Sequence, residues 1–212
     1  ETNAVNWTDD QVNEINNIAA GIAFNNIRSV VAEDDPKNPI SPYALAKNIS
    51  MNFVEFYRKT YQLNCITGVL FNHESSLRPE TFITQKIITG AINSLKERDF
   101  KLEIGNINVI RDWGDAEEYV EGIQKITRAK IIKDQIICTG IATSLEEFID
   151  KVFSKLSLNW KNHIKINSKL FRESDIKRSV GDPTACFKDT GWKSSVEIDE
   201  MISKLIKNKM NN

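Results

Sequence analysis

The chain has 212 residues and a formal net charge of −1, with 41% hydrophobic and 27% charged residues. This composition is ordinary for a globular protein with a packed core. The small charge gives no general attraction for nucleic acid or for an anionic membrane. No stretch approaches the roughly 20 consecutive apolar residues of a membrane span, and the first residues lack a signal-peptide pattern. We therefore expect a cytoplasmic protein with no nucleic-acid or membrane partner.

The three cysteines, Cys65, Cys138 and Cys186, stand far apart in the sequence. An odd number without a C-x-x-C pair argues against a disulfide framework and against a thiolate metal site. We expect reduced, mostly buried thiols and no metal centre.

Residues 1–32 are rich in asparagine and contain one helical pattern. Thr8 and Gln11 have the spacing of a capping box. Apolar residues follow at helical spacing: Val12, Ile15, Ile18, Ala19, Ile22 and Ile27. The helix should end before Asp34, and the prolines at 36, 39 and 42 predict an extended entry to the next element.

The pattern over residues 43–61 predicts a second helix. Its inward side chains should be Ala44, Leu45, Ile49, Phe53 and Phe56. Residues 64–71 form a short, apolar and β-branched run, which predicts a buried strand. Residues 72–80 are polar and predict a loop.

The remaining pattern alternates helices with short strands. Helices are predicted over 81–98, 115–129, 144–156 and 194–208, and Ser144 with Glu147 forms a second capping box. Strands are predicted at 102–105 and 134–139, whereas 106–113 is irregular and 163–172 alternates weakly. Elements of these lengths in this order predict an α/β architecture.

Tyr43 and Lys47 are four residues apart on the predicted helix, so their side chains share one face. A phenol is a poor base at neutral pH because its pKa is about 10, and a nearby ammonium lowers that pKa. The spacing therefore fits an acid–base pair. The alternative is a tyrosine and a lysine on a solvated helix face.

A longer series of motifs surrounds this pair. The segment 33–47 resembles the E-x-T-P-x-x-P-x-S-P-Y-A-x-A-K entry of extended short-chain dehydrogenases. The segment 68–75 resembles the G-x-L-F-N-H-E-S motif of the GDP-mannose 4,6-dehydratase family. Residues 84–87 are similar to that family's T-R-K-I, and residues 102–114 to its L-x-x-G-N-L-x-A-x-R-D-W-G.

The resemblance continues to the end of the chain. Residues 118–120 are similar to D-Y-V and residues 138–140 to A-T-G. The stretch 171–193 resembles R-P-x-E-V…G-D-P…L-G-W-K. The matches run from Glu33 to about Met201 in order and at matching spacing. N-H-E-S with R-D-W-G is specific to this family within the short-chain dehydrogenases.

The resemblance implies an α/β fold, namely the C-terminal part of a Rossmann-type parallel sheet with a small α/β substrate-binding domain. Residues 33–212 would form this partial NAD(P)-dependent epimerase/dehydratase domain, after an unmatched segment 1–32. It implies dehydration of GDP-mannose to GDP-4-keto-6-deoxymannose with NADP, in a homo-oligomer such as a dimer or tetramer.

The resemblance also implies roles for single residues. Tyr43 resembles the base that removes the 4-hydroxyl proton, and Lys47 the lysine that holds the nicotinamide ribose. His73 and Arg78 resemble loop residues that contact the cofactor. Four others resemble residues around the diphosphate and sugar: Asn72, Lys86, Arg111 and Arg172. Guanidinium and ammonium groups suit a diphosphate.

Each of these residues has a structural alternative. His73 could be a loop histidine with satisfied hydrogen bonds, and Lys86 a solvated helix lysine. Arg111 could pair with Asp112 or a helix carboxylate, and Arg172 with Asp175.

The sequence also departs from the family pattern. It has no G-x-x-G-x-x-G turn after a strand and no S-[ST]-E-x-[YF]-G segment, so the pyrophosphate turn and part of the elimination machinery are absent from it. Asp175 stands for Glu, Gln85 for Arg, and Leu77 for Arg or a small residue. We therefore expect this chain alone to be inactive. The alternatives are a dehydratase or epimerase of another sugar nucleotide, and a non-catalytic nucleotide-sugar-binding remnant.

Overall fold

The computed structural model describes residues 30–97, 99–171 and 175–211. The helix predicted between Thr8 and Ile27 and the candidate residue Arg172 lie outside the described residues. Within them, no helix is long and apolar enough to cross a membrane.

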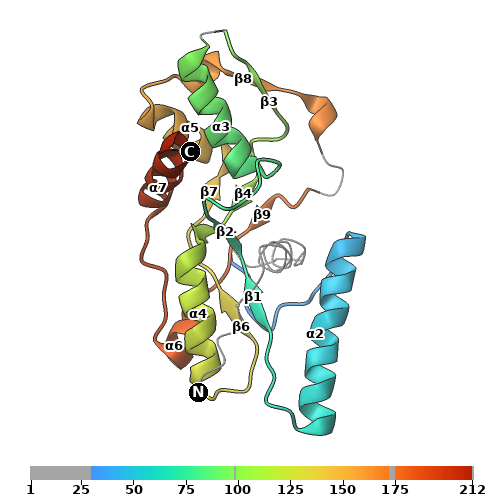
Figure 1. The fold of residues 1–212 in the computed structure, drawn as a ribbon. Helices are drawn as coiled ribbons and strands as arrows, with labels where there is room; N and C mark the ends of the chain where they lie inside the picture. The colour runs from blue at the N-terminus through green and yellow to red at the C-terminus, as the bar shows by residue number, and fades with distance from the viewer. Residues whose placement is uncertain (1–29, 98, 172–174, 212) are drawn as a thin grey trace.

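The lower part of the molecule is a three-layer arrangement (Figure 1). Strands β1 (Gly68–Leu70) and β6 (Gln135–Ile137) pair in parallel. Helix α2 (Pro42–Tyr61) lies on one side of the strands, and α4 (Ala116–Arg128) and α6 (Thr184–Thr190) lie on the other. Strands buried on both faces favour apolar side chains, which Val69 and Leu70 provide in β1 and Ile136 and Ile137 in β6.

Two apolar clusters form the faces of this sheet. Met51 of α2 joins the first cluster, and the second contains Tyr119 of α4 and Cys186 of α6. The first cluster consists of Val31, Met51, Val69, Phe71, Ile136 and Cys138; the second of Leu70, Tyr119, Ile126, Ile137, Cys186 and Trp192. Successive strand residues point to opposite faces, so neighbours such as Val69 and Leu70 enter different clusters.

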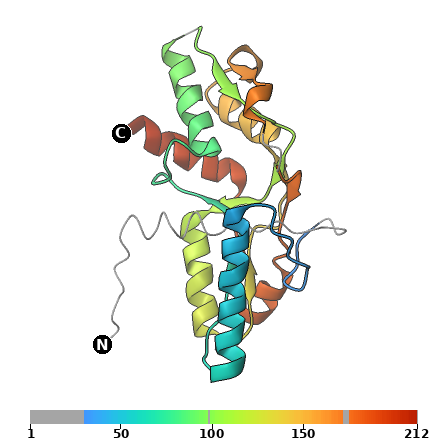
Figure 2. The same ribbon diagram turned by 90° about the vertical axis from the view of Figure 1, so that its right-hand side faces the viewer.

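The upper part holds the largest core. Helices α3 (Ile83–Lys96), α5 (Leu145–Lys155) and α7 (Ile198–Asn211) pack together there (Figures 1 and 2). Strands β3 (Leu102–Ile104) and β8 (Ile164–Ile166) pair in parallel beside them. The core includes fully buried side chains from all three helices, among them Ile87, Ile88, Phe148, Ile149, Phe153 and Ile202.

Short strands connect the two parts. Strand β2 (Asn72–Glu74) pairs in parallel with β5 (Trp113–Asp115). Strand β4 (Ile110–Arg111) lies between β7 (Thr143–Ser144) and β9 (Arg178–Ser179). Two 3-10 turns complete the described elements, η2 (Trp160–Asn162) and η3 (Ser168–Leu170).

Helices α2, α4 and α5 begin at polar caps, Ser41, Asp115 and Ser144. The Ser41 hydroxyl accepts a hydrogen bond from the backbone of Ala44, with Pro42 following at the first helical position of α2. The Ser144 hydroxyl accepts one from the backbone of Glu147, which confirms the predicted start of α5. These caps satisfy backbone donors that a helix leaves unpaired.

The predicted helices and buried strands agree with the structure to within about four residues at each end. The structure adds several short elements: the predicted loop 72–80 begins with strand β2, the predicted irregular segment 106–113 contains β4, and β5, β7, β9 and α6 were not predicted. Local sequence misses these short elements because pairing with distant strands, not side-chain alternation, stabilises them. The weakly alternating segment 163–172 contains β8.

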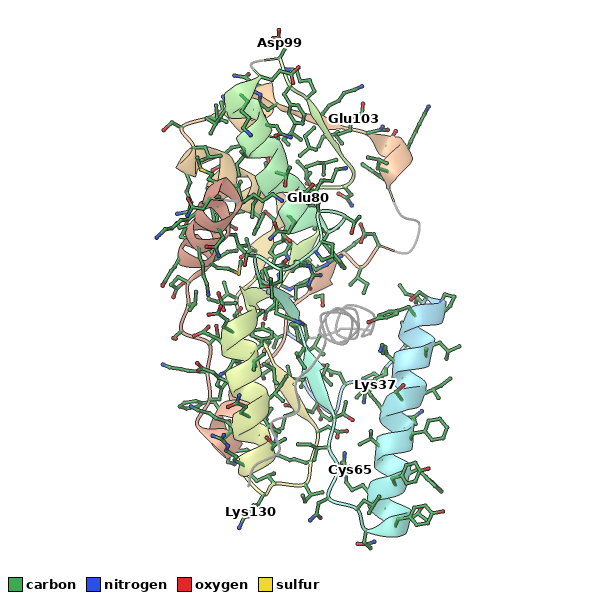
Figure 3. The ribbon with its side chains drawn as sticks, in the orientation of Figure 1. Lys37, Cys65, Glu80, Asp99, Glu103 and Lys130 are labelled. Carbon is green, nitrogen blue, oxygen red and sulfur yellow. The ribbon has the colours of Figure 1, made fainter. Side chains whose placement is uncertain are left out.

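The inward face predicted for α2 is wrong at four of its five residues. Only Ala44 is buried, whereas Leu45, Ile49, Phe53 and Phe56 are 49%, 45%, 58% and 50% exposed. Met51 is the residue of this helix that joins the apolar cluster on the sheet, whereas the broader apolar side of the helix is exposed. We call these four exposed residues the outward stripe of α2; side chains project from this helix away from β1 in Figure 3.

The cysteines are free thiols, as expected. Cys138 and Cys186 are buried, and Cys65 is half-buried. Burial raises the pKa of both buried thiols, so they are unreactive at neutral pH.

Candidate active site

Tyr43 and Lys47 lie in the first turns of α2, on the same side of the helix. The Lys47 Nζ atom lies 5.5 Å from the centroid of the Tyr43 ring. The Tyr43 hydroxyl is buried, and no partner for it occurs among the described residues. Burial raises its pKa to about 12. A catalytic lysine should instead lower the pKa of the tyrosine. Here Lys47 lies over the Tyr43 ring, and the effect of burial on the pKa dominates.

His73 and Arg78 lie inside the protein, 4% and 7% exposed. The His73 Nδ1 atom is 2.9 Å from the carbonyl oxygen of Phe71, and its ring lies 5.4 Å from that of Tyr119. The Arg78 Nη1 atom donates to the carbonyl of His73 at 3.0 Å. The guanidinium also lies over the Phe82 ring, 3.9 Å from its centroid. These contacts fix the loop after β2.

A buried carboxylate completes this cluster. Glu74 is 1% exposed, and one of its oxygens lies 3.2 Å from the Arg78 Nε atom. The Thr84 hydroxyl donates to the same oxygen. Burial raises the pKa of Glu74, against the opposing effects of Arg78 and Thr84. The Arg78 guanidinium is thus engaged by protein groups.

The buried His73 should make the fold sensitive to mild acid. Burial lowers the pKa of His73 from its ordinary value of 6.5 to about 4 in the folded chain. As the pH falls below 6.5, His73 therefore becomes protonated in the unfolded chain but stays neutral in the folded chain. Stability should therefore fall by about 2 kcal/mol between pH 7 and pH 5 from this residue alone. Urea unfolding of the chain and of His73→Gln at both pH values measures the difference. An equal loss in both proteins would contradict the assignment.

Arg111 is anchored on β4 by main-chain and carboxylate groups. Its Nη1 atom donates to the carbonyl oxygens of Ile110 at 2.9 Å and Ile176 at 2.6 Å. Its Nη2 atom lies 3.0 Å from a carboxylate oxygen of Asp175. The structural alternative for Arg111 named the neighbouring Asp112 as a partner, but the structure gives Asp175 instead. The two backbone acceptors and the carboxylate orient the guanidinium.

Lys86 and Asn72 lie in the connecting region. The Lys86 Nζ atom donates to the carbonyl of Glu103 at 2.9 Å, which ties α3 to β3. Asn72 pairs in register with Trp113, two residues after Arg111. The short strands therefore place Asn72 and Arg111 in the same region. Tyr43 and Lys47 come from α2, whose first residues lie level with this region in both views (Figures 1 and 2).

Comparison with known proteins identifies the family. A family model described as GDP-mannose 4,6 dehydratase matches residues 25–205. The chain belongs to the GDP-mannose 4,6-dehydratase family. It is 35% identical to GDP-mannose 4,6 dehydratase 1 of Arabidopsis thaliana over 176 residues, covering 82% of this chain and 48% of the relative. It is 31% identical to GDP-mannose 4,6 dehydratase 2 of Caenorhabditis elegans, covering 82% and 50%. The chain thus spans about half the length of the curated relatives it matches.

Solved structures of low sequence identity confirm the Rossmann-type α/β fold. A dTDP-glucose 4,6-dehydratase from Bacillus anthracis in complex with NAD has a TM-score of 0.80 at 15% identity, covering 96% of this chain and 65% of that one. A UDP-glucose 4-epimerase from Thermotoga maritima with UDP-glucose has a TM-score of 0.79 at 17% identity, covering 91% and 61%. At these identities the likeness concerns the fold alone.

Asp112 is a structural residue of this dehydratase-family chain that was not predicted from the sequence. Its side chain is fully buried and accepts hydrogen bonds from the Thr139 hydroxyl at 2.6 Å and the Thr139 backbone at 2.9 Å. The backbones of Gly140 and Gly181 donate to it at 2.9 and 3.3 Å. Burial raises the pKa of Asp112 in spite of these donors. Its place between Arg111 and Trp113 in the R-D-W-G motif was the available signal.

Asp112 joins segments that are distant in sequence. It follows β4, while Thr139 and Gly140 follow β6, and Gly181 follows β9. Gly140 has a φ of 79°, and a Cβ there would lie 3.0 Å from Pro183, so glycine suits this turn. The carboxylate therefore holds the connecting strands, and with them Arg111, against the lower sheet.

Proposed function

We propose that the whole protein dehydrates GDP-mannose to GDP-4-keto-6-deoxymannose, with NADP, in the cytoplasm. The observation that carries this is the match to the dehydratase family over residues 25–205, with Tyr43 and Lys47 on one face of a helix. Residues 33–212 would supply the substrate side of the enzyme, with residues 1–32 outside it.

Each candidate residue has a proposed task. Tyr43 removes the proton of the sugar 4-hydroxyl, and Lys47 supplies the positive charge that favours the phenolate. Arg111 binds the diphosphate, because an oriented guanidinium suits its oxygens. Lys86, Asn72 and Arg172 would complete this substrate site. The net change is loss of water across C5 and C6 after oxidation at C4, followed by reduction at C6.

The residues present fit one side of the cofactor. The Tyr43 hydroxyl is buried without a described partner, and an unpaired buried hydroxyl is stabilised by a ligand that hydrogen-bonds to it. Tyr43 and Lys47 would hold the ribose, while His73 and Arg78 would act by fixing the loop beside it. When bound, NADP would supply the reversible hydride transfer that these residues serve. The chain has no glycine-rich turn for the pyrophosphate.

The purified 212-residue chain should bind GDP weakly and convert no GDP-mannose. Binding rests on Arg111 and Lys86 and should weaken as salt rises, because charged contacts are screened. Turnover needs a positioned cofactor, for which this chain lacks the pyrophosphate turn. Calorimetry with GDP and an assay for the 4-keto sugar measure the two properties.

A fusion to the part of the Arabidopsis relative that the chain does not match supplies the positive control. The fusion should produce the 4-keto sugar, and Arg111→Ala should weaken GDP binding more than Lys133→Ala, which removes an exposed lysine paired with Asp189.

Product from the unfused chain contradicts the incomplete-site proposal. A folded fusion that binds GDP but forms no product favours the second candidate, a non-catalytic nucleotide-sugar-binding protein. If the fusion converts a different sugar nucleotide, the protein is the other alternative, a dehydratase or epimerase of that sugar nucleotide.

We propose that two copies of the chain associate through the outward stripe of α2. Four large apolar side chains, each at least 45% exposed, lie along one side of this helix. Packing these side chains against an identical helix removes apolar surface from water, which stabilises the dimer. The net charge of −1 causes little repulsion between the two copies. Light scattering should give a dimer for the chain and a monomer for Phe53→Ser/Phe56→Ser. The control Val120→Ser, at an exposed position on α4, should remain dimeric. A monomeric wild-type chain at tens of micromolar contradicts this proposal.

A further inference from the structure

Helix α2 is held to the rest of the chain unequally along its length. Its two buried residues are Ala44 and Met51, both in its first half. From residue 52 to residue 61 no side chain is buried; Val54 and Arg58 are half-buried and the others are exposed. Apolar burial stabilises an element roughly in proportion to the area removed from water. Packing therefore fixes the first half of α2 more firmly than the second half.

Arg58 connects the second half of α2 to the start of both strands of the lower sheet. Its Nε atom donates to the carbonyl oxygen of Cys65 at 2.8 Å, and its Nη2 atom donates to a carboxylate oxygen of Asp134. The backbone N–H of Thr67 donates to the same oxygen at 2.8 Å. Cys65 and Thr67 precede β1, and Asp134 precedes β6. Figure 3 labels Cys65 beside the lower end of α2. We call this set of contacts the Arg58 tie.

The Arg58 tie should be stronger than an ordinary surface ion pair. A guanidinium offers several donors in a fixed plane, so it can bind the carbonyl and the carboxylate together. Hydrogen bonds to a charged group are about twice as strong as neutral ones. The side chains of Arg58 and Asp134 are only 19% and 27% exposed, so water and salt screen them less than exposed ions. By contrast, Lys59 pairs with Glu55 at the surface of the same helix, a contact that cannot fix α2 on the sheet.

The direction of α2 sets the position of the candidate catalytic pair. Tyr43 and Lys47 lie in its first turns, and after Pro42 the helix contains no proline or glycine, the usual sites of kinks. The helix should therefore move as one rod. We propose that Arg58 is a positioning residue: its contacts at the starts of β1 and β6 fix α2 on the sheet and thereby hold the Tyr43 hydroxyl and Lys47 in place. The catalytic consequence rests on the proposed function, whereas the fixing of the helix does not.

Acetylation of tyrosine hydroxyls tests the Arg58 tie in the chain alone. The Tyr43 hydroxyl is buried, Tyr61 is exposed and Tyr119 is fully buried, so the three form an internal scale. In the unmodified chain, N-acetylimidazole should label Tyr61 and spare the other two. Arg58→Met keeps an apolar stem but removes both hydrogen bonds. Labelling of Tyr43 should then rise about fivefold or more, because the freed helix exposes the hydroxyl more often. Mass spectrometry of the digested chain measures each tyrosine.

Lys59→Met is the matched control, since it removes a neighbouring cation whose partner lies in the same helix. It should leave Tyr43 protected. In the fusion with the unmatched part of the Arabidopsis dehydratase, Arg58→Met should lower kcat per folded protein by about 10–100-fold, because a displaced base acts poorly even when it remains in the site. The KM for GDP-mannose should stay within about twofold, because the Arg58 tie lies outside the proposed substrate contacts. Lys59→Met should change neither constant.

The outcomes separate the Arg58 tie from the proposed function. Unchanged Tyr43 labelling in a folded Arg58→Met chain overturns the proposal, and so does an equal rise at Tyr43 and Tyr119, which a purely stabilising contact would cause. If circular dichroism shows that Arg58→Met does not fold, Asp134→Asn decides by the same criteria, because it removes the charge and keeps an acceptor oxygen. Selective labelling of Tyr43 with an inactive fusion supports the tie and counts against the dehydratase. An active fusion in which Arg58→Met keeps its full kcat overturns the catalytic role alone.

Discussion

Tyr43→Phe should reduce the rate of GDP-mannose dehydration by a factor of about 10²–10⁴ in the fusion that restores the nucleotide-binding half, the usual effect of losing a general base. Phenylalanine keeps the ring and its packing under Lys47 but removes the proposed proton acceptor. The affinity for substrate should change little, because one neutral hydrogen bond contributes only about 1 kcal/mol. Steady-state kinetics with calorimetry on the same protein separates the two quantities.

Lys47→Ala is the matched variant for Tyr43→Phe. It should lower both the rate and the affinity for cofactor, because the lysine is proposed to act on the ribose and on the pKa of the phenol together. A Tyr43→Phe fusion that retains more than about a tenth of the rate assigns the base to another residue, since so small a loss is below the general-base range. The pair would then be the solvated tyrosine and lysine of the alternative reading.

The fold could be predicted well where apolar periodicity is long. Helices α3, α4 and α5 and strands β1 and β6 lie where the apolar pattern predicts helices and buried strands. The pattern failed on α2, because periodicity identifies an apolar side of a helix but not what covers it. Strand β2 was missed because His73 and Glu74 are polar, and their burial depends on Arg78 and Thr84 contacts that only the fold creates.

The candidate site could be predicted in part. Motif resemblance selected Tyr43, Lys47 and Arg111, and the structure shows Lys47 over the Tyr43 ring and Arg111 hydrogen-bonded to Asp175. It could not predict the raised pKa of Tyr43, because that shift arises from burial in the folded chain. Nor could it show that the Arg111 guanidinium binds Asp175 and the carbonyl of Ile176, which come from a segment distant in sequence.

Asp112→Ala should destabilise the chain by about 3–5 kcal/mol. The substitution leaves four donors without their acceptor, two from half-buried Thr139, one from half-buried Gly140 and one from buried Gly181. An unsatisfied buried donor costs about 1–3 kcal/mol, and partial collapse of the site or entry of water recovers some of the total. This is a large share of the 5–15 kcal/mol that typically separates folded from unfolded protein. The free energy of unfolding in urea measures the loss.

Two further variants test whether the effect arises from the stranded donors. Asp112→Asn keeps the shape and one acceptor oxygen for Thr139, but its amide faces the N–H groups of Gly140 and Gly181, so its loss should be smaller than that of alanine. Glu117→Ala removes an exposed carboxylate that pairs with Lys204, and an exposed ion pair contributes about 1 kcal/mol or less. If Asp112→Ala cost no more than Glu117→Ala, the carboxylate would not be what holds β4 and Arg111 against the lower sheet. The position of Arg111 would then depend on Asp175 and the backbone acceptors alone.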